Sequence, residues 1–295
     1  MFPETGHPSR KATRKRKKGE TAWVDPLGEI SDTRGKHMVS GYWRGLALTV
    51  AMGVSGIAHA HEFIVEPAAM TVSAGAEVQV AGLSTHVFLI SQELEAAKDV
   101  KVGLYASGKR ADIAVKPNEK TLAYEGVMTA PSSGTFIVTG ARLPQILATT
   151  PDGLKQVTKR GTSVSNPYRI EKFAKALVNV TPGDNGFSTA IGDALEIVPL
   201  TNPATVKPGD ELSVKVLFKG QPLTTSVYAT YDGFSKEENT YAYYTEGHKD
   251  GTAKVKITQP GIWMVRVQHS VPEHTEDYDR YVARAVLLFE ITARQ

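Results

Sequence analysis

The sequence contains no cysteine. Disulfides, thiolate metal ligands and a cysteine-borne lipid anchor are therefore excluded, and any bound metal must be held by nitrogen and oxygen. The sequence also lacks a long apolar run. The longest, Gly45–Ile57, has 13 residues, whereas a transmembrane helix needs roughly 20. We therefore expect a protein that does not span a membrane once this segment is removed.

The short apolar run has the features of a signal peptide. Arg44 lies on its N-terminal side, and the triplet Ala58-His59-Ala60 follows it with small residues at the two positions that signal peptidase recognises. This pattern predicts cleavage after Ala60, a mature chain that begins at His61, and export to the periplasm.

The segment before the apolar run is unusual for an n-region. Its basic run, residues 14–18, lies far upstream, so we interpret residues 1–37 as a misassigned start, with Met38 as the real one, or as an unusually long leader. Basic runs also bind nucleic acid, but a nucleic-acid-binding arm has no use in front of an export signal. We therefore treat residues 1–60 as leader and signal peptide.

The net charge changes once the leader is removed. Residues 1–60 hold ten of the 34 Lys and Arg and five of the 31 Asp and Glu, which leaves 24 basic and 26 acidic residues in the mature chain. A chain so close to neutrality gives no reason to expect nucleic acid or an anionic membrane as a partner.

Alternating, β-branched segments predict a mainly β protein. Such segments occupy much of residues 61–139 and return after residue 195, as in Glu211–Phe218 and Gly261–His269, with Gly and Pro between them. We expect two immunoglobulin-like β-sandwich domains, residues 61–185 and 186–295.

A short helical segment is predicted between the two β regions. Asn166 and Pro167 resemble an N-cap followed by proline at the first helical position, and Ile170, Phe173 and Leu177 would share one helical face. The spacing predicts a helix over residues 166–177 that packs on a sheet.

Five histidines remain after processing, and His61 is special among them. As the terminal residue it would offer two neutral donors, the α-amine and Nδ1, which can close a six-membered chelate ring on one metal ion. The terminal amine has a pKa of about 7.7–8.0, so it is easily deprotonated by a transition metal. One further imidazole would complete a three-nitrogen site that suits Cu(II) or Ni(II).

The other candidate ligands are His86, His269 and His274. His86 ends the strand that should follow the one beginning at His61, His269 ends a strand of the second domain, and His274 lies in the acidic loop after it. A site between the two domains would use them together. A purely structural role remains open for each of these histidines and for His248.

Several segments resemble a known family. The opening His61–Pro67, the Gly82–Phe88 element and the strand Gly261–His269 are similar to a periplasmic domain-of-unknown-function family. Its members are labelled nickel uptake transporter proteins or periplasmic components of cobalt/nickel ABC transport systems. The resemblance implies metal handling, and it matches the family's histidines to His61, His86 and His269. Members often have His-Asp where this chain has His61-Glu62.

These observations favour a periplasmic protein that is not an enzyme. It would capture nickel, cobalt or copper for an inner-membrane permease of the ABC or energy-coupling type. Two alternatives stay open: a metal-free adhesion or scaffold module, and a histidine-brace copper oxygenase. The oxygenase would need a flat aromatic face around the metal, for which the candidates are Tyr228, Tyr231, Phe234, Tyr241, Tyr243 and Tyr244.

Overall fold

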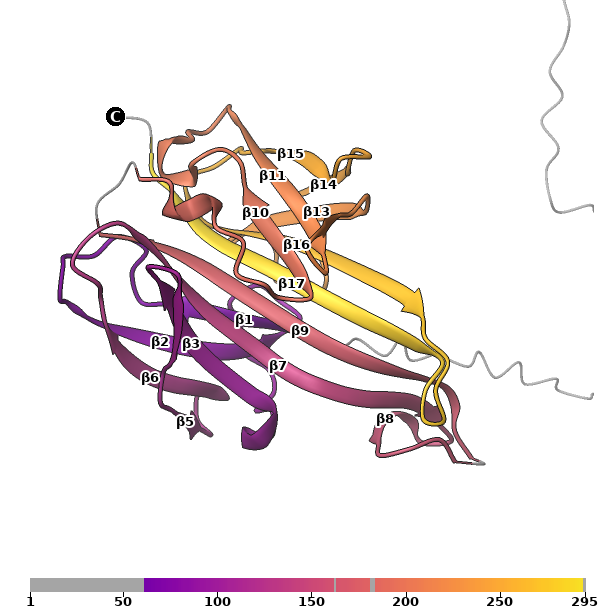
Figure 1. The fold of residues 1–295 in the computed structure, drawn as a ribbon. Coiled ribbons are helices and arrows are strands. Elements are labelled where there is room, and N and C mark those ends of the chain that lie inside the picture. The colour runs from indigo at the N-terminus through magenta and orange to yellow at the C-terminus, as the bar shows by residue number, and fades with distance from the viewer. Residues whose placement is uncertain (1–60, 162, 181–183, 294–295) are drawn as a thin grey trace, which may run out of the picture. The chain divides into compact units, whose positions relative to one another are not determined.

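The computed structural model describes residues 61–161, 163–180 and 184–293. Its strands form three sheets that pack face to face (Figure 1). The prediction of a mainly β, sandwich-like fold is confirmed. The predicted leader, signal peptide and cleavage site fall on residues 1–60, outside the described residues. Within the described part, no helix is long and apolar enough to cross a membrane.

The first sheet has four strands, and each strand pairs antiparallel with its neighbours. Its order is β1 (Glu62–Pro67), β2 (Glu77–Thr85), β6 (Ala123–Thr129) and β5 (Val115–Asn118).

The second sheet is the largest and lies between the other two (Figure 1). Its order is β14 (Tyr243–Glu246), β13 (Ser226–Tyr231), β16 (Gly261–Pro272), β17 (Arg280–Ile291), β9 (Ser165–Asn179), β7 (Thr135–Thr150), β3 (Val100–Ala106) and β4 (Lys109–Asp112), with β8 (Gly153–Val157) paired to β7. We call it the central sheet.

The third sheet consists of β10 (Leu195–Pro199), β11 (Glu211–Phe218), β12 (Gln221–Pro222) and β15 (Thr252–Lys256), with β15 paired to β11. Three short 3-10 helices are described between strands, at Ala97–Asp99, Gly186–Ser188 and Pro203–Thr205.

Two apolar layers hold the three sheets together. One lies between the first sheet and the central sheet and includes Phe63, Val138 and Ala176. The other lies between the central sheet and the third sheet and includes Val214 and Val265. Since successive side chains of a strand point to opposite faces, β7, β9, β16 and β17 each contribute to both layers.

The predicted helix over residues 166–177 is wrong, because this segment is strand β9. β9 pairs in parallel with β17 and antiparallel with β7. Ala174 and Ala176 pack in one apolar layer and Leu177 in the other. A strand buried on both faces reads as a nearly continuous apolar run, so its apolar residues also fit a helical spacing.

The central sheet takes strands from both sides of the predicted domain boundary at residue 185. Within it, β9, from the first predicted domain, pairs in parallel with β17, from the second. The described residues form one compact unit. The division into residues 61–185 and 186–295 therefore stays a prediction.

Candidate histidine site

Two of the candidate ligands, His61 and His86, lie together at one end of the first sheet. β1 pairs antiparallel with β2 so that Glu62 lies opposite Thr85, and this register places the preceding His61 beside the following His86. Their rings stack with centroids 3.8 Å apart and planes inclined by 30°. The pairing of β1 with β2 therefore places these two residues next to each other at one end of the sheet.

A carboxylate that the sequence did not point to completes this group. Nδ1 of His61 lies 2.8 Å from Oε2 of Glu93. The segment that carries Glu93 folds back on the end of β2, where the amide of Gln92 donates to the carbonyl of Ser84 at 2.9 Å and the amide of His86 donates to Oε1 of Gln92 at 2.5 Å. We call His61, His86 and Glu93 the histidine site.

The imidazole of His61 is neutral at pH 7. Burial, the neighbouring His86 and the cation of Lys172 lower its pKa to about 4, against the smaller opposing effect of Glu95. Because the ring is neutral, its contact with Glu93 is not an ion pair. A neutral imidazole keeps a lone pair available for a metal without first losing a charge.

A buried group of charges lies directly behind the histidine site. Oε1 of Glu62 accepts hydrogen bonds from Nε of Arg266 and Nη1 of Arg284, both at 3.0 Å. Burial alone would raise the pKa of Glu62, but Arg266, Arg284 and Lys172 together outweigh it, so the pKa is lowered and the carboxylate is ionised.

A second carboxylate in this region is shared between two buried cations. Oε1 of Glu95 lies 3.6 Å from Nζ of Lys172 and 3.8 Å from Nε of Arg142, and the hydroxyl of Ser84 donates to it at 3.0 Å. Burial, followed by the charge of Arg142, lowers the pKa of Lys172 to about 8. The charges nearest the histidine site are thus held by strands of the central sheet.

The loop between β13 and β14 also reaches the histidine site. The amide of Asn239 donates to the carbonyl of His86 at 3.0 Å. The carboxylate of the preceding residue, Glu238, acts on His61 in the direction that raises its pKa, although burial dominates. A segment more than half the chain away in sequence therefore packs against this site.

The structure does not bring His269 to the histidine site. Along β16, Val265 and Val267 pack toward the third sheet, whereas Arg266 bonds to Glu62 on the other side. The alternation places His269 on the face of Val267, where its ring meets that of Phe218 edge-on at 4.6 Å. The central sheet separates it from His61.

His274 is also remote from the other histidines. It lies in the turn between β16 and β17, its side chain is 79% exposed, and its Nδ1 is 3.5 Å from Oδ1 of Asp279. Among the described side chains, no group of three or more His, Asp and Glu is arranged to hold a metal ion as it stands. The α-amine of a processed His61 would be a donor in addition to these side chains.

The aromatic residues required by the oxygenase alternative do not form one flat face. Tyr228 contacts Tyr241 and Tyr244 at centroid distances of 5.1 and 5.2 Å. Tyr231, three residues along the same strand, points to the opposite face and contacts Phe234 at 5.3 Å. The set is divided between the two sides of β13.

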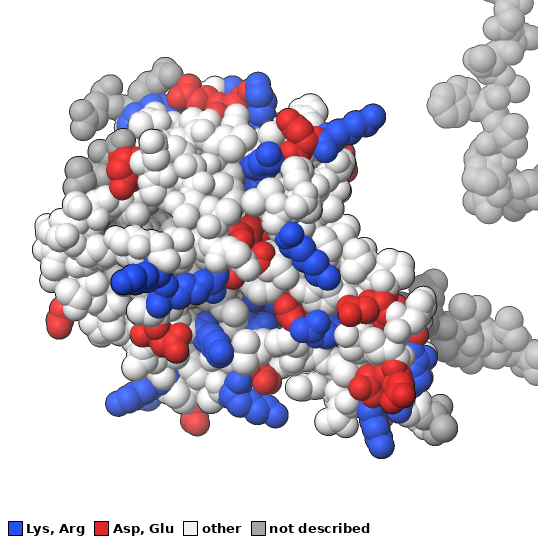
Figure 2. Space-filling model, viewed as in Figure 1, with Lys and Arg blue, Asp and Glu red and all other residues white. Residues whose placement is uncertain are grey.

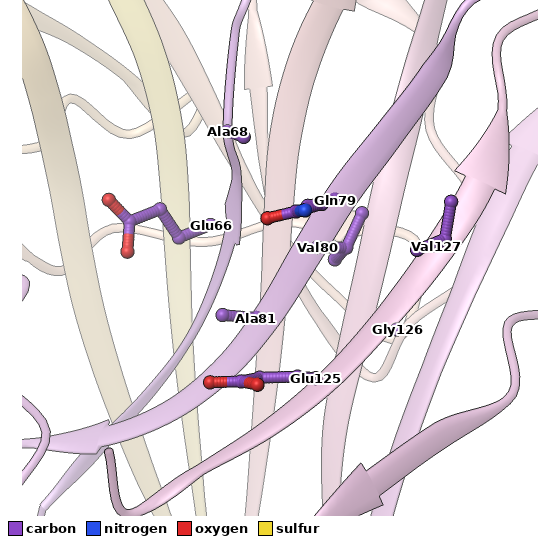
Figure 3. A pocket seen from close by; sticks show the side chains of 8 residues that line it. All are labelled: Glu66, Ala68, Gln79, Val80, Ala81, Glu125, Gly126 and Val127. Carbon is purple, nitrogen blue, oxygen red and sulfur yellow. The ribbon is translucent and has the colours of Figure 1, made fainter. Parts of the chain in front are cut away.

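A groove on the first sheet is a separate concave feature. It has a volume of about 470 Å³, and Glu66, Gln79 and Glu125 point to the same side of it (Figure 3). Glu66, Ala81 and Glu125 lie in one row across β1, β2 and β6, so the alanine leaves room between two carboxylates. No histidine lines the groove.

Charges of both signs are mixed over the face of the molecule shown in Figure 2. Lysine and arginine side chains alternate with aspartate and glutamate, and uncharged surface lies between them. On this face, the described residues form no broad region of one sign.

Comparison with known proteins identifies one family. The model of a family described as a domain of unknown function, DUF4198, matches residues 58–271. The match includes His61, His86 and His269 and ends before His274. No curated protein matches the chain.

Two solved structures are similar to this chain in fold. The D0-D1 domain of intimin is 14% identical, with 78% of this chain and 97% of that chain covered and a TM-score of 0.21. The adhesin InvE from Yersinia pseudotuberculosis is 11% identical, with 76% and 58% covered and a TM-score of 0.19. Scores this low carry no inference about function.

Proposed function

This chain belongs to the DUF4198 family, and we propose that it is an exported periplasmic protein that captures a divalent transition metal, nickel, cobalt or copper, for delivery to a membrane transporter. The observation that carries the proposal is the contact of His61 with both His86 and Glu93. Two imidazoles and a carboxylate at the first residue of a mature chain are suitable ligands for these ions.

The spacing of the donors favours a single ion. Two ligands that are each about 2.0–2.1 Å from a metal and at a right angle to each other lie about 2.9 Å apart. Nδ1 of His61 and Oε2 of Glu93 are 2.8 Å apart. In the tautomer that carries its proton on Nε2, Nδ1 of His61 could therefore occupy one position on an ion and Oε2 of Glu93 a neighbouring one. His86 would have to turn from its stacked position to join them.

Processing would supply the remaining donor. Cleavage after Ala60 would convert the peptide nitrogen of His61 into a free amine, which closes a chelate ring with Nδ1. The family match begins at residue 58, close to this bond, so residues 1–57 are outside the shared region. The unprocessed chain would lack one nitrogen of the site, and metal capture would be confined to the exported form.

Isothermal titration of the chain that begins at His61 with nickel, cobalt and copper tests the proposal. We expect tight binding of at least one of these ions at one per chain. His86→Ala should weaken it by at least about tenfold, equivalent to 1.4 kcal/mol, while His274→Ala, an exposed histidine, serves as the matched control. Failure of all three ions to bind would contradict the proposal and favour the metal-free scaffold.

A further inference from the structure

The residue next to His61 is tied to the opposite end of the sequence. Glu62 is 5% exposed, and its Oε1 accepts one hydrogen bond from Arg266 of β16 and one from Arg284 of β17, each at 3.0 Å. These arginines lie 204 and 222 residues further along the chain. We call Glu62, Arg266 and Arg284 the Glu62 cluster.

The side chain of Arg266 is itself held in place by two further contacts. Its Nη2 donates to Oε1 of Gln268 at 3.0 Å, and its guanidinium carbon lies 5.5 Å from the centre of the Tyr228 ring. A buried carboxylate is costly unless it is paired and hydrogen-bonded. Because Arg266 and Arg284 lie on paired strands, Glu62 keeps both hydrogen bonds only near its present position, and the start of β1 is held with it.

This fixation affects His61 more than any other residue. Chain ends are usually poorly ordered unless they are tied down. In a mature chain that begins at His61, only Glu62 lies between the terminal residue and the rest of β1. The backbone position of His61 relative to His86 then depends on where Glu62 is held.

We infer that Glu62, held by Arg266 and Arg284, is the positioning residue that sets His61 against His86 in the processed protein. The inference rests on the proposed function for its role in metal capture. The contact between the two rings that it predicts is independent of any metal.

Matched substitutions of two buried glutamates test the inference. Glu62→Gln removes the charge but nearly preserves the shape. Glu196→Gln is the control: Glu196 is 3% exposed and accepts hydrogen bonds from Lys175 at 2.5 Å and from the amide of Ile191 at 2.9 Å. Lys175 lies on the face of β9 turned away from the first sheet, so this control loses an equally buried carboxylate without touching β1.

Two readouts are needed on chains that begin at His61. The first, without metal, is the nuclear Overhauser contact between the His61 and His86 rings, which should be present in the unsubstituted chain and in Glu196→Gln but lost in Glu62→Gln. The second is the affinity for copper(II), which we expect to fall about 10–100-fold in Glu62→Gln, as for other residues that orient metal ligands, and to stay unchanged in Glu196→Gln.

The outcomes separate the inference from the proposed function. If the unsubstituted chain binds no copper, the proposed function fails, but the ring contact still tests the role of Glu62. If Glu62→Gln keeps the ring contact and the affinity, the inference is overturned and the metal proposal stands. If Glu62→Gln does not fold, Glu62→Asp replaces it, because it keeps the charge on a shorter side chain. We expect Glu62→Asp to weaken both the ring contact and the copper affinity. An unchanged ring contact and affinity in Glu62→Asp would also overturn the inference.

Discussion

The rings of His61 and His86 stack with their centroids 3.8 Å apart because the residues flank the same end of paired strands. His61 precedes β1 and His86 follows β2, so the antiparallel register places the two residues opposite each other.

His269→Ala should leave metal binding intact. The central sheet lies between His269 and the histidine site, so we expect an affinity within about twofold of the unsubstituted chain. Because the half-buried ring packs on Phe218, the free energy of unfolding should fall by about 1–2 kcal/mol. Titration calorimetry and urea denaturation measure the two effects. A loss of affinity as large as that of His86→Ala would show that the two histidines share a site.

Lys172 should make the protein more stable as the pH rises above 8. Its pKa is lowered from 10.5 to about 8 in the folded chain, so between these values the unfolded state binds more protons. The free energy of unfolding then increases with pH, by up to about 3 kcal/mol over the whole interval.

Urea denaturation of the unsubstituted chain and of Lys172→Met between pH 7 and pH 9.5 checks this prediction. In Lys172→Met the free energy of unfolding should no longer increase with pH. Lys254→Met is the control, because it removes a lysine whose side chain is 62% exposed. Its free energy of unfolding should still increase with pH. An identical pH profile for Lys172→Met and the unsubstituted chain would contradict a neutral Lys172 in the folded state at high pH.

Gly140→Ala should disturb β1 and the histidine site together. A Cβ at this position of β7 would overlap Val65 and crowd Phe63, both in β1. Overpacking of this kind costs about 1–3 kcal/mol. Gly161→Ala is the control, because a Cβ there meets no atom within 4 Å. Thermal unfolding should separate the two variants, and equal melting temperatures would mean that β1 moves aside without cost.

The sequence was a good guide where one face of a strand is buried. The predicted strand over residues 211–218 is β11 with the same bounds, and its alternating burial explains why. The sequence did not predict strand β9, because burial on both faces removes the alternation of apolar and polar residues. Ile170 and Leu177, which a helix would place on one side, project from opposite faces of this strand.

The candidate site could be predicted from the sequence only in part. The approach of His61 to His86 follows from adjacent strands, so it could be expected. Glu93 and Arg266 could not, because nothing local marks a loop carboxylate or an arginine 204 residues from Glu62 as a neighbour. The placement of His269 depended on which face of β16 carries odd residues, and that is fixed only when the sheets pack.

Processing after Ala60 should create the metal site. The most direct measurement compares copper(II) affinity for two purified proteins, one that begins at His61 and one with a run of Gly and Ser before it, long enough to keep histidine out of the first three positions. Because only the first has the amine beside Nδ1, we predict that it binds at least about tenfold more tightly, a difference of 1.4 kcal/mol. Equal affinities would contradict the claim.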